Sequence, residues 1–165
     1  KKMRPGSHVI YGGAGAAALY PVLGAGSLWF WGASVLIDID HYADFVYHNR
    51  FTDFSFKKML DYHAVLHGWW SRPGFLNFEL LHTIEFITPL AVLTWWTGSP
   101  VLLAVTLGFI FHIMLDITSL TLAGVPFIRA HSCTEYFIRK RLLSRSGLNP
   151  TDLYDEAIER INKAD

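Results

Sequence analysis

The chain has 165 residues, of which 52% are hydrophobic, 15% aromatic and 17% charged. Charged residues make up about a quarter of ordinary soluble domains, so this composition is typical of a membrane protein. Lys and Arg together number 14, as do Asp and Glu, and this neutral balance indicates no nucleic-acid partner. The single cysteine, Cys133, excludes an internal disulfide, and no pair of thiolates is present to bind a metal.

Apolar segments predict two transmembrane hairpins. Residues 9–37 carry no charge and are too many for one span of about 20 residues. Within them, Tyr20-Pro21 and Gly24-Ala25-Gly26 favour a turn between two helices. Residues 78–97 and 101–123 form the second apolar pair, with a turn between them. The sequence therefore predicts an all-α, polytopic membrane protein with four transmembrane helices.

Polar residues divide the rest of the chain into an insertion at about residues 42–77 and a basic, helical tail at 126–165. Residues 1–125 are thus predicted to form the transmembrane domain. In the tail, Asn149-Pro150 predicts the start of a helix with Asp152 in its first turn. Lys and Arg are concentrated in the N-terminal residues, the insertion and the tail, which predicts that both termini are cytoplasmic. The alternative, a soluble helical bundle, lacks alternating polar faces in these runs.

Ionisable residues lie at the ends of the predicted spans, where their burial is costly and suggests a function. They are His8 before the first span, Asp38, Asp40 and His41 at the end of the second, His82 and Glu85 early in the third, and His112 and Asp116 late in the fourth.

These residues are predicted to lie in one layer. Counted along a helix from the turn at Gly98, Glu85 and His112 lie at roughly 20 and 18 Å, and His82 and Asp116 at roughly 24 Å. The groups of the first hairpin fall at similar depths, roughly 21 to 24 Å from its own turn. Helical bundles build carboxylate and imidazole metal sites in this way. The sequence therefore predicts a divalent metal site, with Zn as the leading candidate and Mn, Fe or Mg as alternatives.

The same residues carry a resemblance to a known family. His8, Ile37-Asp38-Ile39-Asp40-His41, His82-Thr83-Ile84-Glu85 and His112-Ile113-Met114-Leu115-Asp116 resemble, in order and spacing, the YdjM-like family of predicted inner-membrane metal-dependent hydrolases. The resemblance covers about residues 8–120 and implies a four-helix membrane fold, a bound divalent metal and hydrolase activity. The chain departs from the family pattern in having Ile37 in place of a proline, no His-Arg before His82, and Glu85 where the pattern has another residue.

The leading function is hydrolysis by a metal-activated water, with Glu85 or Asp38 accepting its proton and a phosphoester or lipid as substrate. Gly12-Gly13-Ala14-Gly15 lies in an apolar span and indicates close helix packing rather than nucleotide binding. One alternative is a non-catalytic subunit of a larger membrane complex, with a structural metal site. A di-iron oxygenase, suggested by His63-Ala64-Val65-Leu66-His67, and a haem or pigment on His82 or His112 also remain open.

Overall fold

The computed structural model describes residues 5–163, and most of them lie in helices. The mainly helical class predicted from the sequence is therefore confirmed. The chain folds as two compact units, each built from two separate stretches of sequence. We call the first the hairpin unit, which comprises the described residues up to Asp38 together with Leu80–Pro126. The second is the polar unit, which comprises Ile39–Glu79 and the described residues from Phe127 onward.

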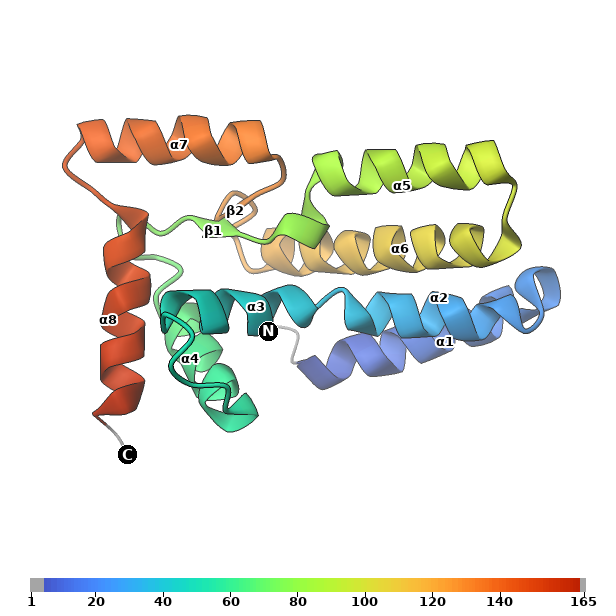
Figure 1. The fold of residues 1–165 in the computed structure, drawn as a ribbon, viewed down its shortest axis with the longest axis horizontal. Helices are drawn as coiled ribbons and strands as arrows, with labels where there is room; N and C mark the ends of the chain where they lie inside the picture. Colours follow the sequence, from blue (N-terminus) through green and yellow to red (C-terminus); the bar gives the residue numbers. More distant parts are fainter. Residues whose placement is uncertain (1–4, 164–165) are drawn as a thin grey trace. The chain divides into compact units, whose positions relative to one another are not determined.

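The first hairpin consists of α1 (Pro5–Leu23) and α2 (Gly26–Leu36), drawn in blue in Figure 1. Gly24 makes the turn with a φ of 53°, a left-handed conformation that glycine adopts without a steric penalty. The sequence suggested that Pro21 belongs to the turn, but Pro21 lies in the last turn of α1 and does not break the helix. Its ring removes one backbone hydrogen bond, and α1 ends less than one turn later.

The second hairpin consists of α5 (Ile84–Thr97) and α6 (Pro100–Leu122). Gly98 ends α5 in the left-handed conformation with a φ of 60°. Ser99 then caps α6, since its side-chain oxygen accepts a hydrogen bond of 3.3 Å from the backbone N–H of Leu102. The turn predicted between the two apolar segments is therefore confirmed.

The start of α5 differs from the prediction. The segment from residue 78 was expected to be helical, but the chain first forms the short strand β1 (Asn77–Phe78) and the 3-10 helix η1 (Leu80–His82). β1 pairs in parallel with β2 (Arg129–Ala130), and local hydropathy does not reveal such a long-range pairing. As a result, His82 ends η1 while Glu85 lies in the first turn of α5. The sequence predicted that both residues lie on one helix, and this prediction is wrong.

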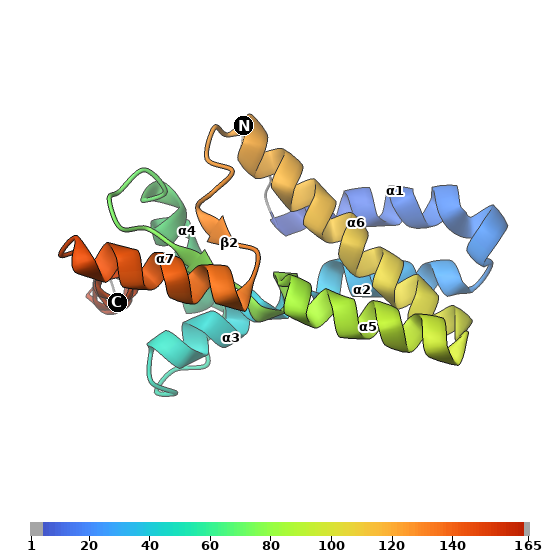
Figure 2. The ribbon, with the colours of Figure 1, turned by 90° about the horizontal axis from the view of Figure 1, so that it is seen from above.

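Within the hairpin unit, α6 packs against both α2 and α5, as Figure 1 and Figure 2 show. A Cβ atom on Gly108 of α6 would lie 2.4 Å from the carbonyl oxygen of Phe30 on α2, so this crossing requires glycine. On the other side, the hydroxyls of Thr94 and Thr106 lie 2.8 Å apart and join α5 to α6. The buried apolar side chains of this unit include Ala16, Phe30 and Ala104.

One helix of the hairpin unit has the length expected of a membrane span. With 23 residues, α6 is long and apolar enough to cross a membrane, by length and composition alone. Among the described residues it is the one helix that meets this criterion; α2, with 11 residues, and α5, with 14, are too short for it. The topology of four transmembrane helices therefore stays a prediction.

The polar unit contains the predicted insertion together with the predicted tail. Its helices are α3 (Ile39–His48), α4 (Phe56–Gly68), α7 (Cys133–Arg145) and α8 (Pro150–Asn162). As predicted, α8 begins with Asn149 as its capping residue and Pro150 at its first position. Apolar residues of α8 share one core with residues of the insertion, so the two segments fold as one unit. This core contains Phe45, Val46, Met59, Tyr62, Leu66, Tyr154, Ala157 and Ile161.

Candidate metal centre

Five residues predicted as metal ligands lie together in the hairpin unit: His8, Asp38, His82, His112 and Asp116. His8 lies in the first turn of α1, Asp38 follows α2 and His82 ends η1. The other two share one face of α6, four residues apart. Two overlapping sets have ligand atoms within 4.8 Å of one another: His8 with His112 and Asp116, and Asp38 with His82 and His112.

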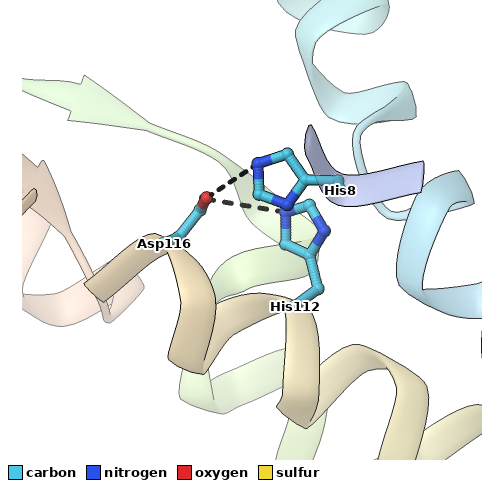
Figure 3. A group of neighbouring side chains, drawn as sticks. All are labelled: His8, His112 and Asp116. Carbon is cyan, nitrogen blue, oxygen red and sulfur yellow. Dashed lines mark ion pairs between the residues drawn. The ribbon is translucent and has the colours of Figure 1, made fainter. Parts of the chain in front are cut away.

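The carboxylate of Asp116 faces three imidazole rings. Its Oδ1 lies 3.3 Å from Nε2 of His8, and its Oδ2 lies 3.6 Å from Nε2 of His112 and 3.7 Å from Nε2 of His82. Figure 3 shows the first two of these contacts converging on Asp116. Asp116 is only 9% exposed, and a carboxylate so far removed from water requires positive charge nearby. Protonated imidazoles or a bound cation would supply it.

The hydrogen bonding of His112 assigns one ring nitrogen to the backbone and the other to the carboxylates. Its ring is fully buried, and its Nδ1 lies 2.7 Å from the backbone carbonyl oxygen of Ser34. Because a carbonyl oxygen only accepts hydrogen bonds, Nδ1 must donate, which leaves the lone pair of a neutral ring on Nε2. That Nε2 lies 3.2 Å from Oδ1 of Asp38, in addition to the contact with Asp116. A protonated ring would donate from Nε2 to these carboxylates, whereas a neutral ring would direct a lone pair at them, which is repulsive unless a cation lies between the groups.

The stacking of the imidazole rings favours a metal cation over protonated rings. The rings of His8 and His112 are stacked with centroids 4.2 Å apart and an interplanar angle of 22°. The ring of His82 meets that of His112 edge-on, at 5.2 Å. Protonating adjacent rings at these distances would place like charges in contact within a buried site. Neutral rings that bind one shared cation avoid this repulsion, so the residues present fit a divalent metal.

Close helix packing positions His112 against its carbonyl partner. Gly108 lies one turn before His112 on α6, where α2 approaches most closely. Gly12 of α1 lies against Ser34, because a Cβ there would be 2.3 Å from the Ser34 hydroxyl oxygen. A backbone carbonyl that orients a ligating histidine is a common feature of metal sites. Sequence analysis did not identify Ser34 or Gly108, since a backbone acceptor leaves no signal in side-chain type.

Three other predicted site residues lie elsewhere. Glu85 is exposed in the first turn of α5 and belongs to neither ligand set, so its catalytic role stays a prediction. Asp40 and His41 lie in the first turn of α3, in the polar unit. There, Nε2 of His41 is 3.6 Å from Oε1 of Glu79, whose Oε2 lies 2.8 Å from Nη2 of Arg129. Sequence analysis did not single out Glu79, the buried carboxylate of this network.

The two histidines that suggested a di-iron centre belong to the polar unit. Nε2 of His63 lies 2.7 Å from the carbonyl oxygen of His41, and the rings of His63 and His67 have centroids 6.4 Å apart. Burial, with the neighbouring His41, lowers the pKa of His63 to about 4, so its ring is neutral at pH 7. Among residues 5–163, neither His63 nor His67 belongs to a group of three clustered ligands.

Comparisons with known proteins return no match: no family model, no curated protein and no solved structure matches this chain. The resemblance to the YdjM-like family therefore stays a prediction that rests on the residues quoted for it.

Proposed function

We propose that the hairpin unit lies in a membrane as two helical hairpins. The apolar length of α6 supports this placement, and so do the large apolar side chains on the surface of the unit. Contiguous exposed apolar surface is rare on soluble monomers but is expected in contact with lipid. Tryptophan and tyrosine, which are enriched where the bilayer meets water, occupy the turns of α1, α2 and α5 next to the two hairpin loops. These are Tyr20, Trp29, Trp95 and Trp96, each more than half exposed.

The five-residue cluster would then lie in the inner half of the bilayer. His112 and Asp116 are roughly 18 and 24 Å along α6 from its first residue. A hydrocarbon core of about 30 Å would leave roughly 6 to 12 Å between the cluster and the far boundary. Of the shorter helices, α2 with 11 residues ends near the level of the cluster, and α5 with 14 residues begins near it. Cytoplasmic termini follow from the distribution of Lys and Arg, and an inner (plasma) membrane location is what the resemblance to the YdjM-like family implies.

The second part of the proposal is a divalent metal ion bound by His8, His82, His112 and Asp116, with Asp38 beside it. The observation that carries it is the position of Nε2 of His112, which faces the carboxylates of Asp38 and Asp116 while Nδ1 lies against the carbonyl oxygen of Ser34. Imidazole and carboxylate together suit Zn, Mn or Fe better than Mg, which prefers oxygen ligands. Bound there, such an ion would act as a Lewis acid that polarises a water molecule or a substrate oxygen.

Hydrolysis is the reaction that this arrangement supports best. The side chain of Asp38 is 29% exposed, whereas those of His82, His112 and Asp116 are at most 12% exposed. Asp38 is therefore the acid placed to meet incoming water and to accept its proton. At this depth in the bilayer, the substrate class is a lipid or a phosphoester near the headgroups. The resemblance to metal-dependent membrane hydrolases is in line with this proposal.

Elemental analysis of the detergent-purified protein tests the metal centre. We expect the wild-type chain to retain a transition metal and His112→Ala to lose most of it, because His112 belongs to both ligand sets. The matched control is His67→Ala, a histidine of the polar unit that belongs to neither set. Equal metal content in the wild type and His112→Ala would rule out the centre. Loss in His67→Ala alone would favour a metal site in the polar unit.

The depth of burial favours one second candidate, a structural metal site in a subunit of a larger membrane complex. Structural sites are closed, whereas catalytic sites keep an open coordination position. His82 and His112 are almost inaccessible, and among the five clustered residues the side chain of Asp38 is the most exposed. Water exchange at a bound paramagnetic metal, such as Mn²⁺, separates the two candidates. Fast exchange is expected for the hydrolase and none for the structural site.

A further inference from the structure

Helix α7 of the polar unit presents a mixed apolar and basic face to its surroundings. None of its residues is fully buried, although it contains several large apolar side chains. Phe137 is 67% exposed, Ile138 is 55% exposed and Leu142 is 54% exposed. The spacing of these residues places all three on one side of the helix. The polar unit therefore leaves this side of α7 without a packing partner of its own.

Basic residues occupy the same side of α7. Arg141 and Arg145 are exposed and follow Phe137 at intervals of four residues. The acidic residue of the helix, Glu135, is instead engaged within the unit, since Arg139 donates to it at 2.8 Å and the backbone N–H of His131 donates to it at 2.9 Å. The exposed face thus combines apolar anchors with net positive charge.

This combination matches the chemistry of an anionic bilayer surface. Amphipathic helices that lie in the membrane interface insert apolar side chains between lipids and place Lys or Arg among the headgroups. Each basic residue near an anionic leaflet contributes roughly 1 kcal/mol of attraction. An acidic protein partner would be attracted by the same arginines, but it would not require three large apolar side chains beside them.

The chain also holds α7 within reach of such a surface. Residues 123–132 connect α6 to α7, and a segment of this length spans at most roughly 36 Å when fully extended. We propose that α7 docks on the anionic, cytoplasmic leaflet through Phe137, Ile138, Leu142, Arg141 and Arg145, and this inference rests on the membrane placement of the hairpin unit proposed above. Docking would hold the polar unit at the surface from which a lipid or phosphoester headgroup approaches.

Spin labels on the full-length chain in nanodiscs test this docking. In a Cys133→Ser background, a nitroxide is attached at Ile138→Cys, and its collisions with oxygen and with a water-soluble nickel complex are measured. In nanodiscs that contain phosphatidylglycerol, we expect the label to meet oxygen and to be shielded from nickel. In pure phosphatidylcholine, or at 1 M salt, we expect it to become accessible to nickel, because the electrostatic attraction is lost.

Charge reversal provides the matched comparison. The double variant Arg141→Glu/Arg145→Glu should lower the docking equilibrium by at least about 25-fold, that is about fivefold for each arginine. The same number of charges is reversed at the C-terminal end of α8 in Arg160→Glu/Lys163→Glu, which should leave docking unchanged. A label at Leu103→Cys on α6 reports on the membrane placement itself, and one at Glu159→Cys on α8 reports on water.

The outcomes separate the two proposals. If the label at position 138 is equally accessible to nickel in both lipids while the label at position 103 lies in lipid, α7 does not dock. The membrane placement is then unaffected. Shielding of position 138 from both oxygen and nickel also overturns α7 docking, in favour of a second copy or another protein. If the label at position 103 is itself accessible to water, the membrane placement fails and α7 docking fails with it.

Discussion

At the scale of single residues, His112 connects the parts of the candidate centre. Its Nδ1 donates to the carbonyl oxygen of Ser34, and its Nε2 faces Asp38 and Asp116. His8 stacks on its ring. Both ring nitrogens therefore have fixed neighbours, and Nε2 would be a preorganised ligand atom for the proposed metal. This arrangement explains how an apolar helix tolerates a histidine and an aspartate four residues apart.

The two carboxylates near His112 should have different functions. Asp116→Asn removes the more buried carboxylate and should abolish most metal binding. Asp38→Asn should retain most of the metal and reduce hydrolysis by about 100-fold or more, because a general base contributes that much to catalysis. Metal content is measured by elemental analysis, and turnover with bis(p-nitrophenyl) phosphate as the probe. If Asp38→Asn loses metal as fully as Asp116→Asn, Asp38 is a ligand and not the proton acceptor.

At the scale of the elements, the crossing of α2 and α6 at Gly108 determines the position of the Ser34 carbonyl. Because a Cβ on Gly108 would meet the Phe30 carbonyl oxygen at 2.4 Å, Gly108→Ala must push α2 away from α6. Such overpacking costs about 1–3 kcal/mol of stability. The shift should also lengthen the hydrogen bond from His112 to Ser34 and lower the metal affinity by about 10- to 100-fold.

Gly32→Ala is the matched control for this prediction. A Cβ on Gly32, in the middle of α2, would have no neighbour within 4 Å, and alanine is the better helix former. We expect this variant to keep its metal and to be as stable as the wild type or slightly more so. Thermal unfolding in detergent and metal titration measure both properties. Equal metal affinities for the two variants would contradict a positioning role for the α2 and α6 crossing.

Local sequence signals predicted the hairpins well and the segment before α5 poorly. Gly24 and Gly98 mark turns because each adopts a positive φ that other residues avoid. The hydropathy of residues 78–83 predicts a helix, but the first residue, Phe78, pairs with Ala130 of β2, more than 50 positions later. His82 and Glu85 therefore do not lie on one helix, contrary to the prediction. His82 nevertheless belongs to the cluster, because it lies at the end of η1.

At the scale of the whole molecule, the prediction of four spans requires both hairpin turns to lie outside the cell. Single cysteines at Ala25 and Thr97, both exposed, should react with an impermeant maleimide added to intact cells in a Cys133→Ser background. A cysteine at Glu159 in α8 should react only after permeabilisation. If Ala25→Cys and Thr97→Cys label on opposite sides of the membrane, only an odd number of spans separates them, and the two-hairpin topology is wrong. Recovery of the chain in the soluble fraction would instead support the soluble bundle.

The sequence by itself determined the mainly helical class, the two turns and five of the residues that cluster in the hairpin unit. These features depend on local properties: hydropathy, the backbone freedom of glycine, and the cost of placing ionisable groups among apolar residues. Only the tertiary structure decided which of the candidate residues converge, that Glu85 is exposed on α5 and in neither ligand set, and that the insertion folds with the tail. Those outcomes depend on contacts between residues distant in the chain, such as Tyr154 donating to the carbonyl oxygen of Leu76. The depth of a residue along a helix follows from counting, but the direction in which it points follows from the helix it packs against.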